Sequence, residues 1–300
     1  MKKPKNLVKG SLVRIVSTAR KISYDELIPS IKLFESWGLR VELGANTLSE
    51  YNQFAGTFDL RLKDLQGAID DPNVDAIWCS RGGYGTTMLL DHLDFSHFKT
   101  HPKWVIGYSD VTSLLCHITT NLKIATLHAT MPINIKPPKT EEQTLTTESL
   151  RKVLFGQSLT YELPDHALNS IGTCSGPLIG GNLSILYSIL GSKSSPNTNG
   201  SILFIEDLDE YLYHIDRMLV NLKRNHVFDG LSGVIVGGMS DMNDNTIPFG
   251  QTAEEIIHSQ LKDYSFPVYF GFNAGHVTPN LALPFGIPIT IKNSTISIDF

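Results

Sequence analysis

The N-terminal half of the chain alternates short apolar runs with stretches of helical spacing. The apolar runs occupy residues 12–16, 39–43, 74–79 and 105–108, and helical spacing occupies 24–37, 60–69 and 86–93. Strands that are apolar throughout must be buried on both faces, and a helix between two strands allows them to run parallel. The pattern therefore predicts an α/β fold with a parallel sheet covered by helices on both faces.

The rest of the chain predicts a second domain. Residues 136–147 gain proline and polar residues and lose apolar periodicity, which is typical of a linker. Strands are then expected at 202–205, 234–236 and 268–270, helices at 183–190, 214–225 and 252–261, and a hairpin at 287–298. At 300 residues and 41% hydrophobic, the chain can fill two cores. We expect one domain of residues 1–138, a linker of 139–165 and a second domain of 166–300.

Charge and composition exclude several classes of partner. The net charge of −5, without a block of like charges, argues against a nucleic-acid surface, so a small molecule is the expected partner. The N-terminus has no apolar h-region and no run of 18 apolar residues occurs, so we expect no membrane segment and a cytoplasmic location. Cys79, Cys116 and Cys174 lack metal-ligand spacing and are expected to be buried thiols. For that reason we expect no metal. We also expect no cofactor, because no nucleotide-binding glycine motif is present.

One predicted strand ends in a turn that could carry a nucleophile. The run that begins at Trp104 ends in Gly107-Tyr-Ser-Asp110 and continues into a predicted helix. A tight strand-turn-helix lifts the turn side chain out of the sheet and directs the first free N–H groups of the helix toward it. Ser109 is therefore a candidate nucleophile. Helix capping is the alternative, and Val111 stands where a Gly-x-Ser-x-Gly elbow has its second glycine.

A second strand end is rich in glycine. Residues 79–85 read Cys-Ser-Arg-Gly-Gly-Tyr-Gly, with Gly82, Gly83 and Gly85 just before a predicted helix. Such a backbone can adopt positive φ and approach a ligand closely, which suits a cradle for an oxyanion or a substrate. A glycine-rich turn without a ligand remains the alternative.

Two more polar residues follow predicted strands and would complete a catalytic triad. A hydroxyl nucleophile needs a base such as imidazole, and the imidazole needs a carboxylate to orient it. His276 and Glu206 stand at the right places for these tasks. Alternatives remain at this point: His128 or His117 could be the base, and Glu206 and Asp207 could be solvated loop carboxylates.

Five motifs in order resemble one known family. They are Arg81-Gly-Gly-Tyr-Gly85, Gly107-Tyr-Ser-Asp110, Gly180-Gly-Asn182, Ile205-Glu-Asp207 and Gly275-His276. Together they resemble the LD-carboxypeptidase family of serine peptidases, which includes muramoyltetrapeptide carboxypeptidases and microcin C immunity proteins. The resemblance covers nearly the whole chain. It implies a flavodoxin-like N-terminal domain that carries the nucleophile and a smaller, β-rich α/β C-terminal domain that carries the other two triad residues.

The same resemblance implies a role for each site residue. Ser109 would be the nucleophile, His276 the general base and Glu206 the carboxylate that orients the histidine. The backbone N–H of Asp110 and one from the Gly82-Gly83 turn would form the oxyanion hole.

The reaction implied by the family is release of the terminal D-amino acid from muropeptides, by hydrolysis of an L-to-D bond in cell-wall peptidoglycan recycling. A second branch hydrolyses peptide-nucleotide antibiotics of the microcin C type. The segment between Ser109 and Glu206 is compact and has no long aromatic insertion, which favours the recycling branch. We also expect a homodimer that binds a small peptide substrate.

A carboxypeptidase must bind a free α-carboxylate, which requires a cation or a cluster of N–H groups. Arg81 and Arg217 are the candidate cations, and Tyr84 and Asn182 are further candidates for substrate binding. Arg217 could instead be a helix-surface residue paired with Asp216 or another neighbour. The alternative for the whole chain is a non-catalytic flavodoxin-like module that holds an anion in the turn at residues 81–85.

Overall fold

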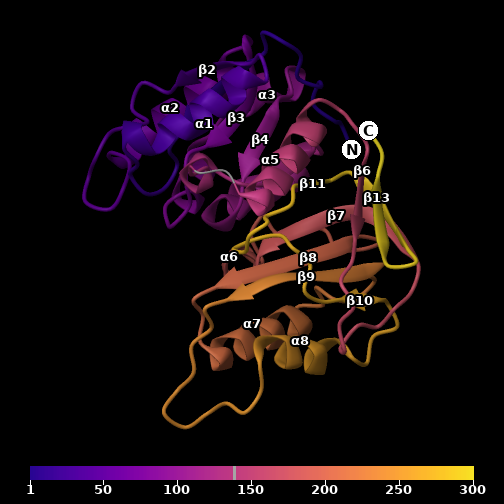
Figure 1. Cartoon of the computed structure of the whole chain (residues 1–300). Helices are drawn as coiled ribbons and strands as arrows, with labels where there is room; N and C mark the ends of the chain where they lie inside the picture. Colours follow the sequence, from indigo (N-terminus) through magenta and orange to yellow (C-terminus); the bar gives the residue numbers. More distant parts are fainter. Residues whose placement is uncertain (138–139) are drawn as a thin grey trace.

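The computed structural model describes residues 1–137 and 140–300, and it contains two β-sheets with their covering helices (Figure 1). The six-stranded sheet has the order β11-β5-β4-β3-β1-β2, and the seven-stranded sheet has the order β10-β9-β8-β7-β12-β13-β6. The first sheet lies mainly in the N-terminal half and the second in the C-terminal half. This arrangement confirms the predicted α/β fold with two parts.

The six-stranded sheet is parallel except at one edge. Its strands are β1 (Leu12–Val16), β2 (Arg40–Leu43), β3 (Val74–Cys79), β4 (Trp104–Gly107), β5 (Thr126–His128) and β11 (Leu283–Phe285). The first five pair in parallel, as their apolar sequences predict, while β11 pairs antiparallel with β5. Its helices are α1 (Tyr24–Ser36), α2 (Phe58–Asp70), α3 (Ser96–Thr100), α4 (Thr112–His117) and α5 (Glu141–Leu154).

Local signals fix the start and the packing of α1. Ser23 and Glu26 form a capping box, in which each side chain bonds to the backbone N–H of the other residue. Leu27 and Phe34 lie on one face of the helix and are buried. The Phe34 ring stacks on Trp78 of β3 at a centroid distance of 4.0 Å. Helix α1 is thereby held against the sheet.

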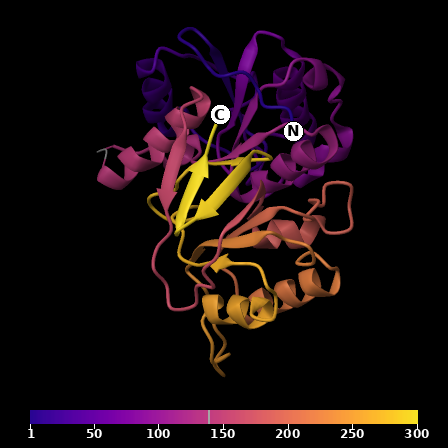
Figure 2. The same cartoon turned by 90° about the vertical axis from the view of Figure 1, so that its right-hand side faces the viewer.

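The seven-stranded sheet mixes parallel and antiparallel strands. Its members are β6 (Leu159–Glu162), β7 (Cys174–Asn182), β8 (Ile202–Leu208), β9 (Gly233–Ser240), β10 (Val268–Tyr269), β12 (Pro288–Lys292) and β13 (Thr295–Ile298). Strands β7 to β10 pair in parallel. Strands β12 and β13 form the predicted closing hairpin, which pairs with β6 and β7 on its two sides (Figure 2).

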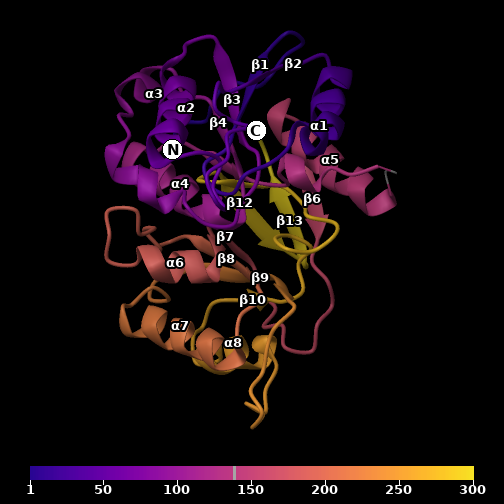
Figure 3. The same cartoon turned by 90° about the vertical axis from the view of Figure 1, so that its left-hand side faces the viewer.

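Alternation along β8 directs its side chains toward two different cores. Leu203 and Ile205 pack in one core with residues of α6 (Leu183–Ile189), α7 (Leu212–Arg224) and α8 (Ala253–Leu261), and Figure 3 shows α7 and α8 below the sheet. Phe204 faces the opposite way and belongs to the core shared with the six-stranded sheet. Because successive side chains on a strand alternate, Glu206 also faces the N-terminal half. The strand therefore presents this carboxylate to the other sheet.

The segment assigned to a linker is structured where it is described. Within residues 140–165 lie helix α5 and strand β6, while Pro138 and Lys139, at the expected domain boundary, lie outside the described residues. Leu150 and Leu154 of α5 are fully buried in the core, so packing explains a helix that its weak apolar periodicity did not predict. Strand β11, from the far end of the chain, joins the N-terminal sheet. The division into domains at these boundaries stays a prediction.

Two other expectations concern thiols and membranes. Cys79, Cys116 and Cys174 are all buried free thiols, as expected. No helix in the described part of the chain is long and apolar enough to cross a membrane.

Candidate active site

Ser109 lies in a strained turn directly after strand β4. Its φ is +60°, a left-handed conformation that is uncommon for residues other than glycine. The chain turns so tightly that a Cβ atom on Gly107 would come within 2.8 Å of the Val111 side chain. A short 3₁₀ turn at Ser109–Val111 then leads into α4. This geometry confirms the predicted strand-turn-helix, and strain of this kind is often found at functional sites.

Ser109, His276 and Glu206 form one hydrogen-bonded chain. The Ser109 Oγ lies 3.2 Å from Nε2 of His276, and Nδ1 of His276 lies 2.6 Å from Oε2 of Glu206. A carboxylate can only accept, so Nδ1 carries the proton and Nε2 is left as the acceptor for the serine hydroxyl. The three side chains that the strand-end pattern singled out are thus in contact, in the order that a nucleophile, a base and an orienting carboxylate would need, and these catalytic roles stay a prediction.

The loop that carries His276 fits closely against Glu206. The backbone N–H of His276 donates to the same Oε2 atom at 3.2 Å. Gly275 has a φ of +97°, and a Cβ atom there would lie 2.5 Å from Oε2 of Glu206. Only glycine leaves room for this approach. The orientation of the imidazole is thereby fixed by two contacts to one buried carboxylate.

Burial and charge act in opposite directions on His276. Burial lowers its pKa, whereas the hydrogen bond to Glu206 and the charges of Glu206 and Asp207 raise it. Together these contacts outweigh burial, so the pKa of His276 lies above its ordinary value. Glu206 is completely buried. A charged imidazole beside a buried carboxylate is thus favoured, which is the state that a general base reaches in the transition state.

Asn182 contacts Asp207, the chain neighbour of Glu206. Its Nδ2 donates to Oδ1 of Asp207 at 2.8 Å, and its Oδ1 caps α6 by accepting from the N–H of Ile185. The N–H of Ser184 also donates to Asp207. Burial and the nearby charge of Glu206 nevertheless raise the pKa of Asp207 to about 7. The amide of Asn182 is therefore engaged in positioning Asp207, and a role in substrate binding stays a prediction.

The glycine turn at residues 82–85 lies against the nucleophile. A Cβ atom on Gly82 would lie 3.1 Å from Oγ of Ser109 and 3.5 Å from the backbone nitrogen of Asp110. Gly83 and Gly85 have φ values of +115° and +135°, which glycine adopts readily. Glycine at position 82 thus keeps open the space in which an oxyanion would meet these groups. The oxyanion hole itself stays a prediction.

The side chain of Asp110 supports this arrangement rather than facing a substrate. It is 2% exposed, and its Oδ2 accepts a hydrogen bond of 2.9 Å from the N–H of Thr86, just after the glycine turn. Burial raises the pKa of this carboxyl group. Asp110 therefore ties the turn at residues 82–85 to the turn that carries Ser109.

The two alternative bases are placed elsewhere. His128 is fully buried among Tyr108, Phe204 and Phe285, and neither ring nitrogen has a hydrogen-bond partner within the described ranges. Burial lowers the pKa of His128 to about 4. His117 bonds to Ser194 Oγ at 2.9 Å. His276 is the histidine that contacts Ser109.

The other candidates for substrate binding make contacts away from the triad. Arg81 donates to the backbone oxygen of Lys21 at 3.1 Å, and Tyr84 is 53% exposed. The guanidinium of Arg217 lies 5.1 Å from the ring centroid of Tyr213 on the same helix. The described neighbour of Arg217 is thus Tyr213, which fits the alternative of a helix residue paired with a neighbour. Roles for Arg81, Tyr84 and Arg217 in substrate binding stay predictions.

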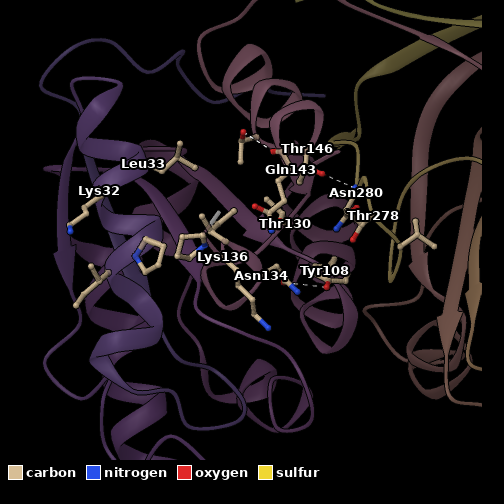
Figure 4. Close-up of a pocket in the computed structure, with 16 residues that line it drawn as sticks. Lys32, Leu33, Tyr108, Thr130, Asn134, Lys136, Gln143, Thr146, Thr278 and Asn280 are labelled. Carbon is tan, nitrogen blue, oxygen red and sulfur yellow. Dashed lines mark hydrogen bonds between the residues drawn. The ribbon is translucent and has the colours of Figure 1, made fainter. Parts of the chain in front are cut away.

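A cavity of about 630 Å³ lies close to these three side chains, and Figure 4 shows the residues that line it. Four segments surround it: helix α1, residues 130–137, helix α5 and the loop at residues 277–280. Tyr108 and Val277, which line it, are the chain neighbours of Ser109 and His276. No sequence motif indicated this cavity, because its wall comes from separate segments of the chain and part of it, including Gln143 and Thr146, belongs to the segment interpreted as a linker.

In the described part of the chain, no group of three or more His, Cys, Asp or Glu side chains could hold a metal ion. What the site offers chemically is a hydroxyl, an imidazole and a carboxylate in hydrogen-bonding order, next to a cavity large enough for a small-molecule ligand.

Comparison with known proteins assigns the fold and the motifs to one family. Residues 13–129 match the N-terminal domain model of the LD-carboxypeptidases, and residues 175–291 match the C-terminal domain model. A probable murein peptide carboxypeptidase of Bacillus subtilis is 34% identical over 290 residues, covering 95% of this chain and 89% of that protein. A murein tetrapeptide carboxypeptidase of Pseudomonas aeruginosa is 30% identical and covers 95% and 94%.

A solved structure has the same architecture. The structure of MccF in complex with glutamyl sulfamoyl guanosine superposes with a TM-score of 0.87 at 27% identity, covering 99% of this chain and 98% of that one. Fold and site together define a two-sheet α/β protein of the carboxypeptidase type, a peptidase hydrolase. The chain belongs to the LD-carboxypeptidase family.

Proposed function

We propose that this protein is a serine carboxypeptidase that hydrolyses the L,D-peptide bond of muropeptide tetrapeptides and releases the terminal D-amino acid. The observation that carries the proposal is the chain of contacts from Ser109 Oγ to His276 Nε2 and from His276 Nδ1 to Glu206. The murein carboxypeptidases among its relatives support the substrate class.

The proposed mechanism uses these three side chains in turn. His276 removes the hydroxyl proton as Ser109 attacks the carbonyl carbon, and Glu206 stabilises the resulting imidazolium. The tetrahedral oxyanion would lie in the space beside Gly82, where the N–H of Asp110 can reach it. His276 then protonates the leaving amine, and water hydrolyses the acyl-enzyme by the reverse sequence of proton transfers.

The alternative is a hydrolase of microcin C type that confers immunity. MccF is its representative among the relatives and the solved structures. A non-catalytic anion-binding module is the weaker candidate, because it gives no reason for three side chains from two sheets to lie in hydrogen-bonding order.

The test is to measure release of D-Ala and L-Ala from two tetrapeptides that differ only at the terminal Cα. Inversion there moves either the carboxylate or the methyl group out of its pocket, and loss of a buried charge-assisted contact lowers kcat/KM by about 30-fold to several thousand-fold. Equal rates would contradict the L,D specificity. Rapid cleavage of an aminoacyl-nucleotide in preference to either peptide would favour the immunity function.

A further inference from the structure

The cavity beside the triad is larger than the leaving group of the proposed reaction. Its volume of about 630 Å³ falls in the range of roughly 300–1,000 Å³ that small-molecule sites occupy. A terminal D-alanine would leave most of this space empty. The part of the substrate that would fill it is the peptide on the other side of the cleaved bond.

The lining of the cavity suits a peptide. Ile28, Pro29 and Leu33 of α1 supply apolar wall, while hydroxyl and carboxamide groups come from the other segments (Figure 4). Lys32 and Lys136 are charged, and none of the described lining residues is acidic. Carbonyl oxygens and carboxylates, which a muropeptide carries, are the groups that such a lining attracts.

Asn280 offers a free donor to this cavity. It is 5% exposed, and its Nδ2 is buried without a hydrogen-bond partner among residues 1–137 and 140–300. Its Oδ1 accepts from the N–H of Gly275, and its backbone N–H donates to Oγ1 of Thr146, both at 2.9 Å. Buried donors without partners are rare and cost about 1–3 kcal/mol. A ligand carbonyl oxygen in the cavity would remove this cost.

The same side chain also holds the loop of the catalytic base. Oδ1 of Asn280 accepts a hydrogen bond from the N–H of Gly275, the residue before His276. A movement of the loop at this point would break that bond. Thr146 connects the loop to α5, the opposite wall of the cavity. Asn280 therefore lines the cavity and also bonds to the residue that precedes His276.

We propose that the cavity binds the acyl part of the substrate, which is the peptide that precedes the cleaved bond. Asn280 Nδ2 donates a hydrogen bond to a carbonyl oxygen of this peptide, and Asn280 Oδ1 holds the base loop at the same time. The proposal rests on the proposed function, because it takes the substrate to be a peptide of several residues with a small leaving group.

Two substitutions test the assignment in the inactive Ser109→Ala protein, by calorimetric binding of the tripeptide that remains after D-Ala is removed. Asn280→Asp retains an acceptor for Gly275 but replaces the donor, so the tripeptide should bind about 3- to 10-fold more weakly or worse. Gln143→Trp puts a large ring at a half-buried position of α5 that lines the cavity, and should also weaken binding at least tenfold.

The matched control is Asn169→Asp. Oδ1 of Asn169 also accepts from a backbone N–H, that of Phe270, but its Nδ2 already donates to the backbone oxygen of Pro164 and the residue lies outside the cavity lining. This variant should bind the tripeptide as tightly as the Ser109→Ala parent. Thermal unfolding of each variant separates lost binding from lost folding. If Asn280→Asp does not fold, Gln143→Trp still tests whether the cavity binds the tripeptide.

The outcomes separate this assignment from the function on which it rests. No D-Ala release by the unsubstituted enzyme would overturn both. Release of D-Ala by that enzyme, together with unchanged tripeptide affinity in Asn280→Asp and Gln143→Trp, would overturn the cavity assignment alone. Weakened binding of free D-Ala with intact tripeptide binding would overturn it too, because the cavity would then hold the leaving group.

Discussion

The Oγ of Ser109 lies 3.2 Å from Nε2 of His276, although the serine follows a strand of one sheet and the histidine a strand of the other. The contact therefore depends on how the two sheets pack. Phe204 and Phe285 belong to the core that the sheets share, close behind the site. The proposed active site therefore requires this core to be packed.

The Glu206→Gln variant should change both the rate and the pH dependence of catalysis. In the parent, kcat/KM should rise as His276 loses its proton, at a pH above the ordinary imidazole value because the pKa is raised. The neutral amide of the variant would lack the charge of Glu206 and its charge-assisted hydrogen bond, which together raise the pKa of His276 most, while burial would still lower that pKa. The rise should therefore move to lower pH, and the limiting rate should fall about 10²- to 10⁴-fold.

The control for this prediction is Asp207→Asn, since Asp207 is the smallest contributor to the raised pKa of His276. Its pH profile should shift less than that of Glu206→Gln. A rate profile that is identical in the parent and in Glu206→Gln would mean that the histidine acts without this carboxylate.

The Gly82→Ala variant should fold normally but have a much lower kcat. The added methyl group would enter the space 3.1 Å from the Ser109 Oγ, where we place the oxyanion. Loss of one oxyanion donor or of its geometry reduces kcat by about 10²- to 10³-fold. Steady-state kinetics together with a melting curve would check this.

Gly67→Ala is the matched control for Gly82→Ala. Gly67 lies inside α2, and a Cβ atom there would meet nothing within 4 Å. Alanine should stabilise the helix by about 0.5–1 kcal/mol without a change in rate. If Gly82→Ala also retained the parent rate, the oxyanion would have to lie elsewhere.

His128→Phe should retain activity and resist acid better than the parent. His128 is neutral in the folded protein because burial lowers its pKa from 6.5 to about 4. The stability that the neutral imidazole contributes is complete at a pH above the pKa of the unfolded state, and it is lost as the pH falls through the pKa of the folded state. The free energy of unfolding should therefore fall by roughly 3 kcal/mol between pH 7 and pH 4. The His128→Phe variant should not show this loss of stability, because phenylalanine does not titrate.

Urea unfolding at both pH values measures the effect, with exposed His97→Phe as the control. An inactive but folded His128→Phe protein would reopen the question of which histidine is the base.

Chelators should not affect the reaction. The proposed mechanism needs no Lewis acid, because the base and the oxyanion donors come from the protein. Turnover measured before and after dialysis against EDTA should be the same. Loss of activity that zinc restores would contradict the mechanism.

Sequence reasoning could predict the parts of the fold that local patterns encode. Continuous apolar runs indicated the parallel strands, and polar residues at their ends indicated Ser109, Glu206 and His276. Period-two alternation also determines that Glu206 and Phe204 share a face of β8. What sequence could not provide was the distance between these residues.

The misjudged parts depend on tertiary contacts. Helix α5 has a polar sequence that resembled a linker, and burial of Leu150, Val153 and Leu154 stabilises it. Strand β11 pairs across the chain with β5, which no local signal indicates. No sequence pattern indicated Asn280, because an isolated asparagine belongs to no motif and its partners, Gly275 and Thr146, come from other parts of the fold.

The most direct test of the central claim is kcat/KM for D-Ala release by Ser109→Ala and by the parent. Removal of the hydroxyl leaves the fold, the cavity and the oxyanion space in place, so a melting curve should be unchanged. The account predicts a loss of about 10³- to 10⁶-fold, with the remaining rate due to binding and oxyanion stabilisation. Turnover by Ser109→Ala close to that of the parent would contradict it.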